Sequence, residues 1–406
     1  MRRGSAVVAV VVGLAGLVGG AAARAMEPVD AATAGVGRLA WDLVRAGGAG
    51  NAIVSPVSVW EALAMTHAGA RGETAAEMAR LLGMPDDRAA IAAAAEAIRK
   101  SFADAKGEKI TLDVANRLWV QREKKLAADF TALLESRYGA GAGVVDFAGA
   151  PEAARAEING WVGDHTARKI TELLPAGTIS PLTRLVLTNA VYLKAPWATP
   201  FEKFATQPEP FHVSATVRAD VPFMHRAGTL VAGTVNEGPQ AATVCELPYE
   251  GDRLAMVVVV PQAVDGLGGV LAGLDGGSLA GWRTEALRAR PVRLALPKWK
   301  ARKPLDLEAT LVGLGMKQAF QQGVADFSGM DGTRDLFVSA VVHEGFVEVS
   351  EEGTEAAAAT GVAVATRAAP VRDEPLEVQA DRPFAWAVVD RGSGAILFAG
   401  VVADPR

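Results

Sequence analysis

The sequence predicts an α+β fold in one large domain, and three observations lead to this prediction. Helical patterns dominate the first third of the 406-residue chain, strand patterns dominate from about Arg184 onward, and no Pro/Ser-rich linker or internal repeat divides the two parts. Half of the residues are hydrophobic and 21% are charged, which is typical of a globular protein with a large core. The formal net charge is -5 and no long basic run is present, which argues against binding to nucleic acid or to an anionic membrane surface.

The first 25 residues have the pattern of a secretory signal peptide. Arg2 and Arg3 precede an uncharged stretch over residues 6–18, and the motif Ala-Arg-Ala at 23–25 matches a cleavage site. We therefore expect cleavage after this motif and a mature chain, residues 26–406, that is secreted or periplasmic and holds no membrane segment. An uncleaved membrane anchor is the alternative, which the short stretch rich in Gly and Ala disfavours.

Local signals place four helices in the first part of the chain. Ser55 precedes Pro56, which puts a capping side chain before a proline at the first helical position. Thr74 and Glu77 form an apparent capping box, and the Leu-Gly-Met-Pro motif at 82–85 is a helix stop. Amphipathic patterns predict two further helices, over 86–104 and 151–168.

Strand patterns follow in the second part. Two apolar runs predict strands that are covered on both faces, at 185–193 and 254–260. Residues 346–351 alternate between apolar and polar side chains, which is typical of a strand. Near the C-terminus, the Arg-Gly-Ser-Gly motif at 391–394 separates two apolar runs, 385–389 and 395–402, and predicts a β-hairpin.

The chain carries little that indicates enzymatic chemistry. Cys245 is the only cysteine, so no intramolecular disulfide can form, and its apolar neighbours indicate a buried structural thiol rather than a reactive one. The sequence has no G-x-S-x-G motif, no P-loop, no H-E-x-x-H motif and no cysteine pair for zinc. The five histidines form no i, i+4 pair, so we expect no metal, no cofactor and no enzymatic activity. A Ser-His-Asp site assembled from distant positions, as in a secreted hydrolase, is the alternative.

One segment near the C-terminus consists almost entirely of small residues. Residues 351–360, with the sequence EEGTEAAAAT, resemble the reactive-loop hinge of inhibitory serpins. Other segments also resemble serpin sequences, in the order of the family, and extend the resemblance over nearly all of residues 30–406. They are 51–58, 188–194 with Trp197 and Phe201, 246–252, 381–384 and 398–405. Each segment alone is weak evidence, but together they are highly specific for the family.

This resemblance implies the serpin fold: a single large α+β domain over residues 26–406 with three β-sheets, about nine helices and an exposed reactive-centre loop at about 351–375. It also implies a suicide substrate, whose cleaved loop inserts into the central sheet and traps a serine protease as an acyl-enzyme. The expected partner is a trypsin-like serine protease in a covalent complex, and the inhibitor is expected to be a monomer. No cluster of Lys and Arg indicates activation by a glycosaminoglycan.

The composition of the hinge suits insertion into a sheet. In one register Thr354 and every second residue after it point toward the core and are small and uncharged, whereas the charged Glu355 points outward. A charged inward side chain would be buried unpaired, at a cost of several kcal/mol. The resemblance assigns these residues to the hinge: Glu351, Gly353, Thr354, Glu355, Ala356, Ala357, Ala358, Ala359 and Thr360. By propensity alone, a capped polyalanine helix is the alternative.

Family spacing places the reactive bond sixteen positions after Glu351, between Arg367 and Ala368. An arginine there suits a trypsin-like pocket, whose floor is a carboxylate. The alternative is an arginine that only keeps an exposed loop soluble. Thr366, which would suit an elastase-like pocket, and Arg372 are competing positions.

Four residues outside the expected reactive-centre loop match positions at which serpins control insertion of the loop. Ser55, Asn189 and His343 fall on the shutter, where hydrogen bonds let the central sheet part and reclose, and Trp197 falls at the breach, where insertion starts. Taken singly, the first three have simpler explanations as a helix cap, a polar strand residue and a core histidine. The alternative function is that of a non-inhibitory serpin, a binding or carrier protein that is cleaved without trapping; the small inward hinge residues disfavour it.

Overall fold

The computed structural model of the chain describes residues 28–48, 50–105, 109–354 and 374–406, and the structural statements below refer to these residues. The expected signal peptide lies outside them. So do the expected reactive bond between Arg367 and Ala368 and the hinge residues 355–360.

The N-terminal part of the chain is helical, as the sequence predicts. A helix begins at Pro56, and the stop at 82–85 ends the next helix, with Gly83 in the left-handed region at φ +70°. The patterns at 86–104 and 151–168 correspond to α4 and α6. The described residues hold ten α-helices: α1 (Pro28–Ala46), α2 (Pro56–Gly69), α3 (Gly72–Leu82), α4 (Arg88–Ala105), α5 (Ala128–Leu133), which continues as the π-helical turn η1 (Leu134–Tyr138), α6 (Pro151–Asp164), α7 (Leu267–Gly273), α8 (Ser278–Glu285), α9 (Glu308–Gly313) and α10 (Ser328–Asp331).

The predicted capping box at Thr74 and Glu77 is wrong, because both side chains make tertiary contacts instead. Thr74 lies inside α3, and its Oγ1 accepts the backbone N–H of Asp326 at 3.1 Å. The Glu77 carboxylate accepts the backbone N–H groups of Lys317 and Gln318, each at 2.7 Å. These side chains therefore fasten distant segments to α3 rather than start the helix.

A six-stranded sheet carries the candidate functional site. Its strand order is β10-β11-β12-β4-β2-β3, and β11 also pairs directly with β4. The runs predicted as strands at 185–193 and 346–351 lie largely in β4 and β11. The strands are β2 (Thr111–Gln121), β3 (Ala142–Val145), β4 (Leu185–Pro196), β10 (Trp299–Asp306), β11 (Val338–Ser350) and β12 (Gly353–Thr354).

The second sheet has nine strands, in the order β1-β15-β14-β8-β7-β6-β9-β13, with β5 paired to β6. The predicted strand at 254–260 forms β8, and the predicted hairpin is the antiparallel pair β14 and β15. The strands are β1 (Ala52–Val54), β5 (Gln207–His212), β6 (Arg218–Val235), β7 (Ala242–Pro248), β8 (Leu254–Pro261), β9 (Arg288–Pro297), β13 (Leu376–Gln379), β14 (Phe384–Asp390) and β15 (Ile396–Val402).

The three sheets that the resemblance implies appear here as two hydrogen-bonded networks. β6 is 18 residues long; its first part pairs with β5, its last part pairs with β7, and β9 runs beside it. Because β6 passes from one layer into the next without a break in pairing, two of the expected sheets form one continuous ladder. The number of sheets therefore depends on how this long strand is counted.

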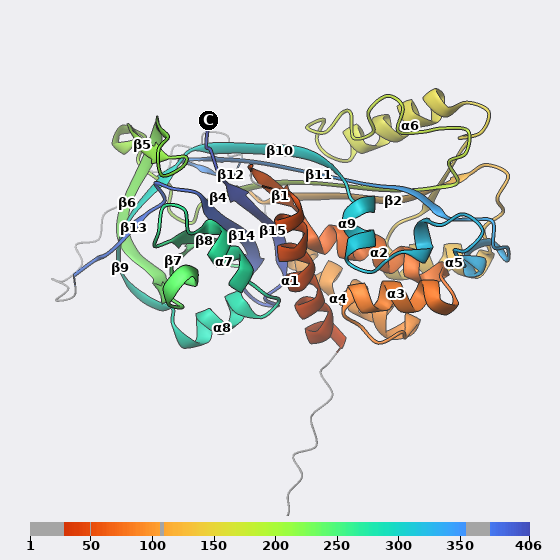
Figure 1. Cartoon of the computed structure of the whole chain (residues 1–406), viewed down its shortest axis with the longest axis horizontal. Helices are drawn as coiled ribbons and strands as arrows, with labels where there is room; N and C mark the ends of the chain where they lie inside the picture. Colours follow the sequence, from red (N-terminus) through yellow and green to blue (C-terminus); the bar gives the residue numbers. More distant parts are fainter. Residues whose placement is uncertain (1–27, 49, 106–108, 355–373) are drawn as a thin grey trace, which may run out of the picture.

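The six-stranded sheet is covered on both faces. α6 packs on one face through a cluster that includes Ile158 and Val186, and α2, α3 and α4 lie on the other face (Figure 1). The main core joins these helices to both sheets and draws on residues from Ala32 to Val402. Cys245 belongs to this core and is fully buried, as predicted, and burial raises the pKa of its thiol to about 12. The thiol is therefore a packing group.

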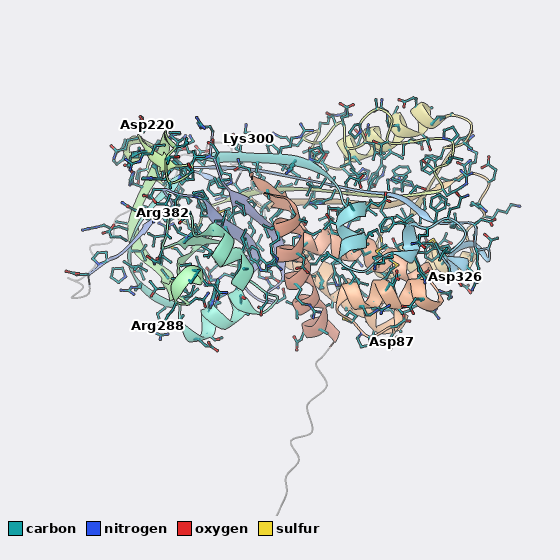
Figure 2. The ribbon with its side chains drawn as sticks, viewed as in Figure 1. Asp87, Asp220, Arg288, Lys300, Asp326 and Arg382 are labelled. Carbon is teal, nitrogen blue, oxygen red and sulfur yellow. The ribbon has the colours of Figure 1, made fainter. Side chains whose placement is uncertain are left out.

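Charged side chains of both signs are spread over the surface (Figure 2). Asp220 and Arg382 lie at the end of the molecule near β5, and Asp87 lies at the other end, below α3. Among the described residues, no helix is both long and apolar enough to cross a membrane. In the same residues, no group of three or more His, Cys, Asp or Glu side chains is arranged to hold a metal ion.

Candidate functional site

β11 and β4 meet in the middle of the six-stranded sheet although they come from distant parts of the sequence. They pair in parallel from Val338 opposite Leu185 to Phe346 opposite Tyr192. Beyond this stretch β12 lies between them and pairs antiparallel with both. The sheet thus has a short extra strand at one end and a direct strand pair along the rest of its length.

Thr354 is the last described residue of the hinge, and it is already part of the sheet. Its side chain is fully buried, and its hydroxyl lies 2.6 Å from the Tyr249 hydroxyl. The Trp197 ring stacks on Tyr249 with ring centroids 4.6 Å apart. Burial raises the pKa of Tyr249, so the phenol keeps its proton and can share it with Thr354. Thr354 therefore points toward the core, as the register predicts, and does so in the uncleaved chain.

The two acidic residues before β12, the buried Glu351 and the half-buried Glu352, are paired with cations. The Glu351 carboxylate lies 2.9 Å from Lys298 Nζ and accepts a hydrogen bond from Thr206 Oγ1 at 2.9 Å. Burial opposes ionisation of Glu351, but the hydrogen bonds from Lys298 and Thr206 outweigh it and lower the pKa of this carboxyl group. Glu352 pairs with Lys203 at 2.5 Å. The acidic residues thus hold the turn that leads into β12.

The backbone of this turn is fastened to the segment that follows β4. The Trp197 backbone N–H donates to the Glu352 carbonyl at 3.0 Å, and its indole Nε1–H donates to the Ser350 carbonyl at 3.0 Å. The Phe201 N–H donates to the Glu351 carbonyl at 2.8 Å. Trp197, which the resemblance assigns to the breach, therefore lies at the end of the sheet that β12 enters.

Gly353 fits where no other residue would. Its φ is +149°, and a Cβ added to it would lie 2.2 Å from the carbonyl oxygen of Ala195. The close approach arises because β12 pairs Gly353 with Pro196 on β4. A glycine at this position therefore lets the turn enter the sheet.

Ser55, Asn189 and His343 come together at the β11–β4 pair. His343 stands opposite Asn189 in the parallel register, and its Nδ1 is hydrogen-bonded to Asn189 Oδ1. His343 Nε2 accepts the backbone N–H of Ser55 at 2.9 Å, which places the ring proton on Nδ1. Burial lowers the pKa of His343 to about 3, so the ring is neutral near neutral pH. A neutral polar link thus spans the two central strands of the sheet.

Ser55 contributes to this network through its backbone only. Its hydroxyl makes no cap bond to α2, so the predicted cap is wrong, and it has no hydrogen-bond partner in the described part of the chain. The hydroxyl that takes part belongs to Ser58, one turn further along α2.

Ser58 and Asn116 complete the network, and sequence reasoning did not identify either of them. The Asn189 amide donates to both Ser58 Oγ and Asn116 Oδ1, and Ser58 Oγ donates to Asn116 Oδ1 at 2.7 Å. Ser58 is the last residue of segment 51–58, which resembles serpin sequences, so the sequence did contain a signal that pointed to this residue. Asn116 is one polar residue in a strand and carries no local signal; only the β2–β4 register places it opposite Asn189.

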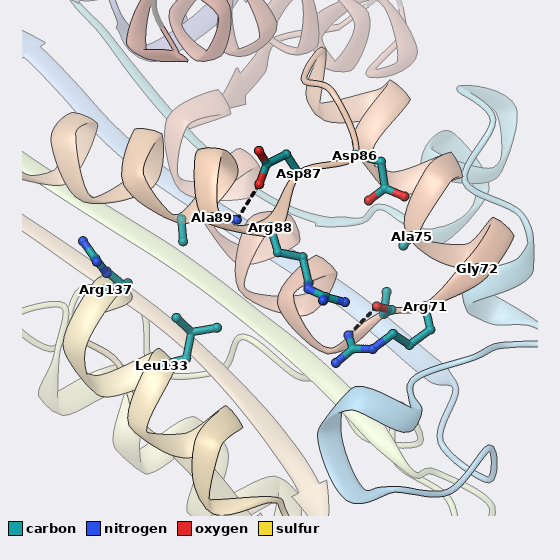
Figure 3. A pocket seen from close by; sticks show the side chains of 11 residues that line it. Arg71, Gly72, Ala75, Asp86, Asp87, Arg88, Ala89, Leu133 and Arg137 are labelled. Carbon is teal, nitrogen blue, oxygen red and sulfur yellow. Dashed lines mark hydrogen bonds between the residues drawn. The ribbon is translucent and has the colours of Figure 1, made fainter.

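A cavity of about 720 Å³ lies away from the β11–β4 pair, near the start of α3 and α4. Three arginines and two aspartates line it, among other residues: Arg71, Arg88, Arg137, Asp86 and Asp87 (Figure 3). Its lining contains none of the hinge or shutter residues, so this cavity is separate from the candidate site.

Comparison with known proteins identifies the family. The family model described as "Serpin (serine protease inhibitor)" matches residues 36–405. The chain belongs to the serpin family. A serpin-like protein of Thermococcus kodakarensis, described as uncharacterized, is 39% identical over 89% of this chain and 82% of its own length. The leukocyte elastase inhibitor of Bos taurus is 39% identical over 88% of this chain and 94% of its own length.

Solved serpin structures share the fold. Serpin48 from the insect Tenebrio molitor, 31% identical, superposes with a TM-score of 0.78 and covers 93% of this chain and 97% of its own. Human thyroxine-binding globulin with thyroxine, 27% identical, superposes with a TM-score of 0.83 over 93% and 99% of the two chains. The predicted serpin fold is confirmed. Since serpins are protease inhibitors and not enzymes, the secreted hydrolase considered from the sequence is excluded.

We expect the substitution Gly353→Ala to displace β12 from the sheet, because the new Cβ would overlap the Ala195 carbonyl oxygen. The unfavourable φ adds about 1–3 kcal/mol of strain. Hydrogen exchange should show faster exchange of the β12 amides. Gly251→Ala is the control, since Gly251 also has a positive φ, +81°, but nothing lies within 4 Å of an added Cβ. Unchanged protection of β12 in Gly353→Ala would contradict the role assigned to this glycine.

Proposed function

We propose that this protein is a suicide inhibitor of trypsin-like serine proteases, which it traps as acyl-enzymes by inserting its cleaved loop between β11 and β4. The observation that carries the proposal is the position of Thr354, buried between these two strands in the uncleaved chain. A segment whose first residue already pairs with both strands can extend by adding residues in the same register. Inhibitory relatives such as bovine leukocyte elastase inhibitor support the proposal.

The register of β12 assigns a position to each residue that would insert. β12 pairs antiparallel with β11 on one side and with β4 on the other. If this pairing continues one residue at a time, Thr360 arrives between His343 and Asn189, which now face each other. Insertion would therefore break the His343–Asn189 link and offer the Thr360 hydroxyl in its place.

The length of the inserting segment matches the length of the strands. In the same register Val364 would lie opposite Leu185, the first residue of β4. Arg367 would then lie just beyond the end of the sheet. At about 3.3 Å per residue, the stretch from Thr354 to Val364 spans on the order of 30 Å. A protease attached at Arg367 would be carried along the whole β11–β4 pair.

The side chains of this segment suit the faces they would occupy. Those on the same face as Thr354 are all small or apolar: Ala356, Ala358, Thr360, Val362 and Val364. The charged Glu355 falls on the opposite face. No charge would therefore be buried in the core during insertion.

The energetics favour insertion once the loop is cut. About a dozen residues would gain ladder hydrogen bonds, each contributing about 0.5–1.5 kcal/mol net, which amounts to on the order of 10 kcal/mol. The uncleaved chain would then persist because of a kinetic barrier rather than by equilibrium. Distortion of the carried protease can stall hydrolysis, because the loss of one oxyanion-hole donor slows such a reaction about 10²–10³-fold.

The target class, location and assembly rest on the sequence. Arg367 before Ala368 fits a pocket with a carboxylate floor. The name of the bovine relative specifies an elastase as its target, and a protease of that kind would fit cleavage after Thr366. We propose export from the cytoplasm on the basis of residues 1–25. We also propose that the inhibitor acts as a monomer and needs no cofactor.

Thr354→Arg should turn the inhibitor into a substrate, because an unpaired guanidinium beside Tyr249 costs several kcal/mol and slows insertion relative to deacylation. After incubation with trypsin, a denaturing gel should show an SDS-stable complex for the wild type and only cleaved chain for the variant. Thr354→Val, which keeps the size of the side chain and adds no charge, is the matched control and should keep the complex.

Two results of this experiment would contradict the proposal. A complex at the wild-type stoichiometry with Thr354→Arg would exclude insertion from this hinge. Cleavage of the wild type without any complex would instead indicate a non-inhibitory serpin that acts as a binding or carrier protein.

Arg367→Ala should lower the association rate with trypsin-like proteases by orders of magnitude, because the charge pairing in the specificity pocket is lost. Mass spectrometry of the wild type after brief exposure to trypsin should place the first cut between Arg367 and Ala368. Arg372→Ala is the control and should leave the rate unchanged. A first cut at another bond, with inhibition retained in Arg367→Ala, would refute the assignment.

The mature protein should begin at Met26, because the predicted cleavage follows the motif at 23–25. N-terminal sequencing of the protein recovered outside the cytoplasm measures this directly. Recovery of a membrane-bound chain that retains residues 1–25 would show an anchor instead of a signal peptide.

A further inference from the structure

A second cavity, of about 280 Å³, lies beside the shutter, between α2, α4, η1 and β2. Most of its lining is apolar, but it also includes Ser58 and Asn116 of the shutter network. Two side chains of opposite charge reach the same cavity, Glu61 from α2 and Arg99 from α4. A carboxyl group in a largely apolar wall, next to the network that closes the central sheet, requires an explanation.

A continuous series of hydrogen bonds links Glu61 to the β11–β4 pair. Asn116 Nδ2 donates to Glu61 Oε2 at 3.0 Å. Asn116 Oδ1 accepts from Ser58 Oγ and from the Asn189 amide, and Asn189 Oδ1 is bonded to His343. The carboxyl group thus stands at one end of the network and the strand pair at the other.

This series crosses the line along which the sheet has to part. β2 and β4 are paired from Thr111 opposite Lys194 to Val120 opposite Leu185, so they would move away from β11 as one unit. α2 contacts both sides of that line. Ser55, the residue before α2, donates its backbone N–H to His343 on β11, whereas Glu61 on α2 accepts a hydrogen bond from Asn116 on β2. Separation of the strands therefore strains the Glu61–Asn116 bond.

We propose that Glu61 is a positioning residue that ties the β2–β4 unit to α2 and thereby sets how readily the central sheet opens. The inference rests on the proposed function, in which opening admits the cleaved loop. Because charge strengthens the bond that Glu61 accepts, opening depends on the ionisation of this carboxyl group.

The surroundings of Glu61 place its titration near neutral pH. Burial raises the pKa of Glu61 to about 7, and Arg99 and the Asn116 hydrogen bond oppose the shift. Within the described residues, the other titratable groups that line the cavity are Arg99 on α4 and Tyr138 on η1. Burial raises the pKa of Tyr138, and His343 has a pKa of about 3, so neither changes its charge near neutral pH.

The sign of the pH effect differs between opening and unfolding. Above about pH 7 Glu61 is ionised and accepts a charge-assisted bond, which is roughly twice as strong as a neutral one, so the sheet is held closed. Below that pH the bond weakens and the sheet opens more readily. For global unfolding, the raised folded-state pKa means that stability falls as pH rises from about 4.5 to about 7, because the ionised group prefers water.

The test compares the mature wild-type chain with Glu61→Gln, which keeps an acceptor for Asn116 but removes the charge. Hydrogen exchange of the β4 and β11 amides reports opening, and comparing the two proteins at the same pH cancels the intrinsic pH dependence of exchange. At about pH 8 we expect these amides to exchange about fivefold to tenfold faster in Glu61→Gln, and at about pH 5.5 at the same rate as wild type. Glu96→Gln, which alters an acid on α4 outside the cavity lining, is the control and should match wild type at both pH values.

Denaturant unfolding separates this role from a purely structural one. Glu61→Gln should not lower the global stability at about pH 8, because it removes a buried charge. Equal exchange in wild type and Glu61→Gln at about pH 8, or a loss of global stability that accounts for the faster exchange, would overturn the proposal.

A second variant keeps the inference testable if Glu61→Gln does not fold. Asn116→Ala removes the other partner, so exchange of its β4 and β11 amides should not depend on Glu61 ionisation, and its excess over the wild-type rate should be larger at about pH 8 than at about pH 5.5. The same excess at both pH values would refute the inference. The exchange experiment needs no protease, so failure to form a complex with trypsin would contradict the proposed function without altering this result.

Discussion

The parallel pairing of β11 with β4 is the contact on which the rest of this structure depends. The backbone ladder between the strands is supplemented by a side-chain hydrogen bond between His343 and Asn189, which are 154 residues apart in the sequence. His343 serves this link because burial keeps its ring neutral, with one nitrogen that donates and one that accepts. Under the proposed function, an inserting strand enters only after this pairing is broken, so the same contact would provide the barrier to insertion.

The charged and the small residues of the hinge have different structural roles. Glu351 and Glu352 pair with Lys298 and Lys203, and they fasten the turn before β12. Gly353 allows the backbone to pass Ala195, and only then does an uncharged side chain enter the core. The charged anchors therefore fix the register of β12.

α2 connects the two halves of the site through residues spaced one turn apart. The backbone N–H of Ser55 before the helix bonds His343, and Ser58 and Glu61, three residues apart on one face, both contact Asn116. Ser55 and Ser58 are buried and are screened little by water, whereas Glu61 is the one half-buried residue of α2. In the role we propose for Glu61, a change in its charge would act on these strands through Asn116.

The sequence by itself determined the fold class, the order of the main elements and the small, uncharged composition of the hinge, because composition, periodicity and turn chemistry are local properties of the chain. It also placed Ser55, Asn189, His343 and Trp197 at positions that the structure brings to the β11–β4 pair and to its end. Tertiary structure alone decided the partners of these groups. Asn116 and Tyr249 lie 58 and 105 residues from the groups they bond, Ser58 and Thr354, and only strand register and the pairing of β12 bring them together. The Thr74 and Glu77 side chains, which resemble a capping box, bond distant backbone instead, because a local motif does not reveal which donors the folded chain brings within reach.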